Sequence, residues 1–167
     1  IKPLKVAVKL FTKANDLEAA LDYANRIIDH YPEDSIGYEY KANRLITLER
    51  FTEARDVVRQ GREIAPNNIQ LLKIESDIYR QTDQREQSLA IGEQIIGLAP
   101  DNWLGYSRLI DDYVALDRVD EAQRSLANYL EDHPLEIKPL KVAVKLFTKG
   151  NDLEAALDYA NRIIDHY

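Results

Sequence analysis

Two identical rows of lysines are the residues of this chain best suited to bind a charged ligand. The rows are Lys2, Lys5, Lys9 and Lys13, and Lys138, Lys141, Lys145 and Lys149. Spacings of three and four place each row on one face of a helix. Residues 2–14 carry no acidic side chain, whereas residues 15–34 carry six acidic side chains and one arginine. Each row therefore predicts a basic helix face that attracts carboxylates of another protein segment.

Catalysis has little support from the remaining residue types. The three histidines are His30, His133 and His166, and two of them follow Asp29 and Asp165. Adjacent residues of a helix point in different directions, so these pairs predict helix-end residues and no metal site. The chain has no cysteine and no glycine-rich phosphate loop. We therefore expect no enzymatic activity, no cofactor and no metal.

A 34-residue period organises the elements that carry these side chains. Residues 1–31 and 137–167 are the same sequence except at Ala14 and Gly150, and prolines stand at 32, 66, 100 and 134. Such a period is typical of stacked helical hairpins. The repeats are then 1–34, 35–68, 69–102, 103–136 and 137–167, with the last a near copy of the first.

Each repeat predicts two helices joined by a short polar turn. Apolar residues at positions 4, 7, 8 and 11 of a repeat follow the spacing of a buried helix stripe, and a second stripe begins at Leu17. Between them lies a pair such as Asn15-Asp16 or Asn151-Asp152. Asparagine tolerates the left-handed conformation that ends many helices, so we expect it at Asn15 and Asn151.

This pattern resembles the tetratricopeptide repeat (TPR) family over the whole chain. Repeat 35–68 carries it most clearly, with Tyr38, Ala42, Leu45, Phe51, Ala54 and Pro66. The resemblance implies an all-α fold, a right-handed α-solenoid of helix-turn-helix repeats, in a single array over residues 1–167. Lys41, Glu75 and Arg85 depart from the family pattern. We expect Lys41 and Glu75, which hold equivalent positions one repeat apart, to form an ion pair.

In proteins that this chain resembles, the first helices of the repeats line a concave groove that takes a peptide or a helix. Carried over position by position, this implies that both lysine rows look into the groove. In the central repeats the inward positions are mixed in charge. The candidate binding residues are Lys2, Lys5, Lys9, Lys13, Tyr40, Asn43, Lys73, Asp77, Arg80, Arg108, Asp111, Lys138, Lys141, Lys145 and Lys149.

Three functions remain open from the sequence. The first is a non-enzymatic scaffold that binds a protein or peptide segment, acidic at its ends, in the groove. The second is a structural or engineered unit whose duplicated repeat controls self-assembly through repeats 1 and 5. The third is an accessory repeat region of a larger bacterial protein.

Composition narrows the partners further. The net charge is −7, which argues against nucleic acid as a ligand. No apolar stretch approaches the length of a membrane span, so we expect a soluble protein, and the lack of cysteine fits cytoplasm or periplasm equally. The chain opens at Ile1 and contains no methionine, from which we expect an excised or engineered piece with any tag or leader omitted.

The near-identical first and last repeats indicate a recent or a deliberate duplication, and we favour the deliberate one. Stacking energy lies between adjacent repeats. The trailing side of repeat 5 therefore complements the side of repeat 2 that repeat 1 covers. We expect either a domain swap between two copies or a terminal cap on repeat 4.

Overall fold

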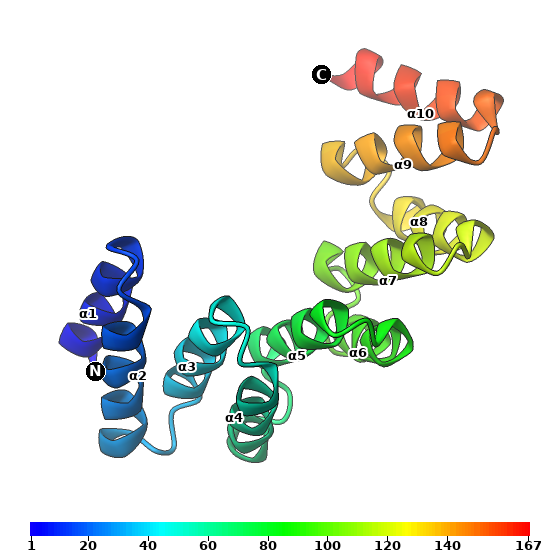
Figure 1. The fold of residues 1–167 in the computed structure, drawn as a ribbon. Helices are drawn as coiled ribbons and strands as arrows, with labels where there is room; N and C mark the ends of the chain where they lie inside the picture. Colours follow the sequence, from blue (N-terminus) through cyan, green and yellow to red (C-terminus); the bar gives the residue numbers. More distant parts are fainter. The chain divides into compact units, whose positions relative to one another are not determined.

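The computed structural model describes residues 1–167 as helices α1 to α10, with no strand (Figure 1). Their bounds are α1 (Lys2–Lys13), α2 (Leu17–His30), α3 (Ile36–Thr47), α4 (Phe51–Ile64), α5 (Ile69–Gln81), α6 (Arg85–Leu98), α7 (Trp103–Ala115), α8 (Val119–Asp132), α9 (Ile137–Lys149) and α10 (Leu153–His166). The all-α prediction and the positions of the polar turns are confirmed. No helix is both long enough and apolar enough to cross a bilayer.

The chain divides into two compact units, Ile1–Asp83 and Gln84–Tyr167. In the first unit α1 packs against α2, α2 against α3, α3 against α4 and α4 against α5. In the second unit the same succession runs from α6 to α10. Each unit is thus a stack in which the second helix of one repeat contacts the first helix of the next. The single array over residues 1–167 stays a prediction.

The turns inside the hairpins repeat one backbone conformation. Five residues that are 34 positions apart have φ between 56° and 60°, namely Asn15, Glu49, Asp83, Asp117 and Asn151. This confirms the left-handed conformation expected at Asn15 and Asn151. The next residue of the first and last turns is an aspartate, Asp16 or Asp152, whose side chain accepts a hydrogen bond from the third backbone N–H of the following helix at 3.1 Å.

The buried residues gather between repeats rather than at one centre. In the first unit Leu21 of α2 shares a core with Tyr38 and Leu45 of α3. In the second unit Ile110 of α7 and Leu146 of α9 belong to one cluster. Because a hairpin has too little apolar surface to bury alone, each repeat depends on its neighbour for its core.

Glu75 pairs with a residue other than the one predicted. Its carboxylate accepts a charge-assisted hydrogen bond from Arg62 of α4, and both side chains are largely shielded. The predicted pair of Lys41 and Glu75 is therefore wrong. Because α4 packs directly against α5, the long guanidinium of Arg62 reaches Glu75 from the nearer helix.

Arg85, which departs from the family pattern, has a buried partner on the neighbouring helix α7. Its guanidinium lies 2.8 Å from the carboxylate of Asp112, which has no exposed surface. Ser88, also fully buried, donates its hydroxyl hydrogen bond to the same carboxylate. A buried carboxylate requires such partners, so these α6 side chains together satisfy Asp112 of α7.

Two helical glycines provide a test of how closely the helices approach one another. A Cβ added to Gly61 of α4 would lie 2.9 Å from the Cβ of Tyr38, whereas one added to Gly97 of α6 would meet nothing within 4 Å. We expect Gly61→Ala to lower the free energy of unfolding by about 1–3 kcal/mol through overpacking. Gly97→Ala, the matched control, should raise it by up to about 1 kcal/mol through helix propensity.

Urea denaturation followed by circular dichroism measures both changes. A stabilising Gly61→Ala would contradict the close contact between α4 and α3.

Candidate functional site

The candidate binding site is a pocket of about 430 Å³ between α7 and α9, the first helices of the last two repeats. We call it the α7–α9 groove. Its lining combines apolar and charged side chains: Ile110, Asp111, Val114, Val142, Lys145, Leu146 and Lys149. This composition suits a ligand that carries both apolar and charged groups.

Helix geometry separates the floor of the groove from its rim. Ile110 and Leu146 are buried, with exposed fractions of 3% and 5%. Lys145 and Lys149 lie one turn apart on α9 and are exposed, as is Asp111 across the groove on α7. An apolar floor beneath opposed positive and negative charges can hold a side chain of the ligand and fix the direction of its backbone.

The groove exists because α9 has a neighbouring repeat before it. Helix α1 has the same sequence as α9 over all of its residues, but in this structure no preceding repeat packs against it. Consequently Leu10, which corresponds to Leu146, is 62% exposed, and Val6, which corresponds to Val142, is 64% exposed. The same side chains thus line the groove in one copy and form an open surface in the other.

The structure brings together three of the predicted binding residues, Asp111, Lys145 and Lys149, from two repeats. Lys138 and Lys141 are exposed on α9 but do not line the groove. In α1 three lysines of the row are exposed and one, Lys5, is half-buried. The α1 row is Lys2, Lys5, Lys9 and Lys13.

Two candidates in α3 are engaged inside the first unit. Tyr40 is half-buried and packs against the core cluster of Val8, Ala24 and Ile27. The side-chain amide of Asn43 donates a hydrogen bond of 2.8 Å to the backbone carbonyl of Glu39, one turn earlier in the same helix. Each of these side chains therefore has an intramolecular role that a ligand would have to share.

The charged candidates of the central repeats are also partly engaged. Lys73 and Asp77 of α5 form an ion pair at 2.9 Å, and Arg80 on the same helix is half-buried. Arg108 of α7 is only 7% exposed. The charges of these central residues are therefore less accessible to a ligand than the sequence alone indicates. The exposed lysines of α9 are more accessible than these central residues.

The apolar part of the groove was not predicted. Val142 and Leu146 stand at positions 6 and 10 of their repeat, outside the stripe at positions 4, 7, 8 and 11 that forms the hairpin core. A helix face that is open to solvent normally carries polar residues, but here two apolar residues lie beside the core stripe and between lysines. This departure is the sequence feature that could have identified the floor of the groove.

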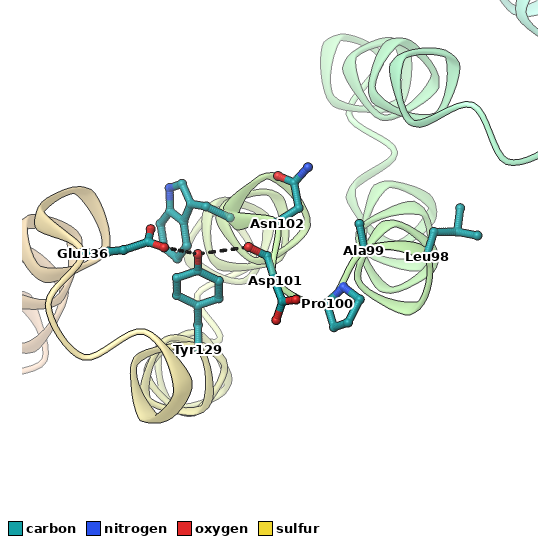
Figure 2. A pocket seen from close by; sticks show the side chains of 8 residues that line it. Leu98, Ala99, Pro100, Asp101, Asn102, Tyr129 and Glu136 are labelled. Atoms are coloured by element: carbon teal, nitrogen blue, oxygen red, sulfur yellow. Dashed lines mark hydrogen bonds between the residues drawn. The ribbon is translucent and has the colours of Figure 1, made fainter.

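A larger pocket, about 580 Å³, lies beside the loop that joins α6 to α7 (Figure 2). The hydroxyl of Tyr129 lies 3.1 Å from the carboxylate of Glu136 and 3.4 Å from the backbone carbonyl of Asp101, as the dashed lines show. The side chain of Asn102 caps α7 by accepting a hydrogen bond from the backbone of Leu104. The Tyr129 hydroxyl and the Asn102 side chain thus already have partners within the protein.

The loop pocket also has a counterpart one repeat earlier. Residues 65–70 line a pocket of about 500 Å³ beside the loop between α4 and α5, with the same order of alanine, proline and a capping asparagine. A hollow that recurs with the repeat period follows from the geometry of the connecting loop. We therefore assign it a structural role, and the α7–α9 groove remains the candidate site.

No group of three metal-ligating side chains lies close enough together to hold a metal ion. His30 and His166 end α2 and α10, as predicted for helix-end residues. His133 caps α8, where its ring stacks on Tyr129 with centroids 4.2 Å apart.

Tyr129 gives a pH-dependent test of the loop pocket. Burial, together with the hydrogen bond to Glu136, raises the pKa of Tyr129 to about 12. Because this folded-state pKa lies above the usual value of about 10, its contribution to stability should be present below about pH 10 and lost as the pH rises toward 12. Tyr129→Phe should cost about 1 kcal/mol at neutral pH and reduce the alkaline loss.

Urea denaturation of both proteins at several alkaline pH values measures the difference. An identical alkaline loss in Tyr129→Phe would contradict the buried hydroxyl.

Known structures share this fold at low sequence identity. MamA from Desulfovibrio magneticus RS-1 superposes with a TM-score of 0.75 and 16% identity, covering 98% of this chain and 93% of that one. TTC0263, a TPR protein of Thermus thermophilus, gives a TM-score of 0.66 with 20% identity over 94% of this chain and 78% of its own. YrrB, described as a TPR protein with an unusual peptide-binding site, gives 0.65 with 18% identity over 95% and 81%.

No family model matches the sequence, and no curated protein matches it either. The structural likenesses define the class of the chain as an all-α solenoid with a TPR-like fold. The fold implied by the sequence resemblance is thereby confirmed.

Proposed function

We propose that this chain is a protein-interaction scaffold that binds a segment of another protein in the α7–α9 groove. The observation that carries the proposal is the apolar floor of Ile110 and Leu146 beneath the exposed Lys145 and Lys149. The segment that fits this arrangement carries an apolar side chain for the floor and acidic side chains for the lysines.

The charges of the groove also indicate an orientation for the segment. Two lysines stand on the α9 side, and Asp111 stands on the α7 side. A segment with acidic residues toward α9 and a basic or neutral residue toward α7 avoids repulsion at both walls. The lysine row of α1 is a second basic surface, but the apolar side chains beside it, Val6 and Leu10, are exposed and form no groove in this structure.

The peptide-binding site named for YrrB adds general support, because it shows that this fold can carry such a site. The accessory role in a larger bacterial protein stays a prediction. An accessory region of that kind would use the same groove.

A direct test compares two variants that share their local sequence. The first is Lys145→Glu with Lys149→Glu in α9, and the second is Lys9→Glu with Lys13→Glu in α1. The probe is a fluorescein-labelled peptide in which glutamate alternates with leucine, measured by fluorescence anisotropy at low and high salt. We expect the α9 variant to weaken binding about tenfold or more, because each reversal turns an attraction into a repulsion. The α1 variant should change it much less.

A peptide in which lysine alternates with leucine is the ligand control, and it should bind weakly to the original chain. Equal losses in the α1 and α9 variants would contradict the groove, because they would show a general attraction between charges. Binding that does not weaken with salt would also contradict the role of the lysines.

A further inference from the structure

The last repeat leaves apolar side chains uncovered on the outward side of α10. Three residues of α10 and the residue that follows it are exposed, at 62%, 62%, 74% and 70% respectively: Leu153, Leu157, Ile164 and Tyr167. We call these four residues the α10 face. They come from positions 17, 21, 28 and 31 of the repeat, and spacings of this kind place them along one side of the helix.

The same chain contains an identical copy of the α10 face that is partly covered: Leu21 and Ile28 pack in the core shared with repeat 2, whereas Tyr31 is 40% exposed. In α2 the corresponding residues are Leu17, Leu21, Ile28 and Tyr31. Leu21 is only 6% exposed and shares a core with Tyr38 and Leu45 of α3. The structure therefore shows which kind of surface covers this sequence, and that surface is the α3 side of repeat 2.

A specific steric fit marks the contact between α2 and α3. A Cβ added to Gly37 of α3 would lie 2.7 Å from Cγ1 of Ile28, so only glycine leaves room for the isoleucine. The second unit repeats this fit between Gly105 of α7 and Ile96 of α6, where the added Cβ would lie 2.6 Å from Cγ1 of the isoleucine. Both isoleucines hold position 28 and both glycines position 3 of the next repeat.

Ile164 also holds position 28, but it is 74% exposed in this structure. The α10 face thus carries the side chain of this fit without a helix packed on it.

One polar contact distinguishes repeat 2 from repeat 4, which has the other such glycine. Arg44 of repeat 2 donates a hydrogen bond to Thr12 of repeat 1, and the equivalent position of repeat 4 is Asp112. The contact of Arg50 with Glu18 at 3.7 Å is shared, because Arg118 lies 3.5 Å from Glu86 in the second unit. Repeat 5 offers the same groups as Glu154 and Thr148. Repeat 2 is accordingly matched to repeat 5 in shape and in charge.

We propose that the α10 face is a docking surface for a second copy of this chain, which it engages through repeat 2. In the first copy repeat 1 already covers that surface, so repeat 5 of the second copy takes its place. This is a domain swap between two nearly identical hairpins. Because the incoming contacts equal those that are lost, the exchange costs little in contact energy, and concentration sets its extent.

Light scattering of the full chain over a dilution series, from micromolar to millimolar, tests the proposal. We expect a mass that rises with concentration. Leu21→Ala weakens the docking of repeat 1 but leaves its copy Leu157 intact, so it should shift association to concentrations about tenfold lower or more. Leu157→Asp with Ile164→Asp should keep the chain monomeric, alone and in the Leu21→Ala background.

The aspartate variant is expected to fold normally, because both replaced side chains are exposed; circular dichroism checks its helix content. Val6→Asp with Leu10→Asp is the matched control at the other end of the chain, with similar exposure, and should leave association unchanged. The proposal is overturned if the Leu21→Ala chain stays monomeric at all concentrations. It is equally overturned if the chain with Leu157→Asp and Ile164→Asp still associates. The same holds if only the chain with Val6→Asp and Leu10→Asp loses association.

Cross-linking identifies the pairing directly, since the chain has no cysteine of its own. Copies with Arg50→Cys are mixed with copies that carry Glu154→Cys, and the mixture is oxidised. Glu18→Cys with Arg50→Cys in one chain is the control for geometry, because those residues are neighbours in the structure. We expect a disulfide between copies in the mixture. An intramolecular disulfide in the control with none between copies would overturn the swap.

Discussion

The contact between the second helix of one repeat and the first helix of the next is the interaction on which this structure depends. A single hairpin cannot bury its apolar residues, so its core is completed by its neighbours. The duplicated hairpin demonstrates this within one molecule. Leucine at position 10 is 62% exposed in the first copy and 5% in the last, whereas leucine at position 21 is 6% exposed in the first and 62% in the last. The residues and the helices are the same, and only the neighbours differ.

The same constraint accounts for both of the surfaces to which we assign a role. The α7–α9 groove forms where two first helices are neighbours and leave an apolar floor between charged rims. The α10 face is exposed in this structure, and its copy in repeat 1 shows the surface that fits it. Binding along the stack and association at its end are therefore separate consequences of one packing rule, and they use different residues of repeat 5.

The sequence predicts the period, the hairpins, the turns and two of the five left-handed residues, Asn15 and Asn151, because these depend on local patterns of apolar, asparagine and proline residues. The other three, Glu49, Asp83 and Asp117, were not predicted. It predicts side-chain partners less well. Glu75 was assigned to Lys41 from equivalent positions, but the nearer Arg62 pairs with it. Arg85 departs from the family pattern, and the sequence alone does not show that its partner is the buried Asp112. Of the fifteen candidate binding residues only Asp111, Lys145 and Lys149 line the groove, because a row of equal positions does not show which first helices approach each other.

Thiol reactivity in this cysteine-free chain tests most directly whether neighbours alone decide what is buried. Four single variants are compared by their rate of reaction with a thiol reagent: Leu10→Cys, Leu146→Cys, Leu21→Cys and Leu157→Cys. We predict fast reaction at positions 10 and 157 and slow reaction at 146 and 21, although each pair has the same local sequence. Measured on dilute, monomeric protein, equal rates within each pair would contradict the dependence of burial on the neighbouring repeat.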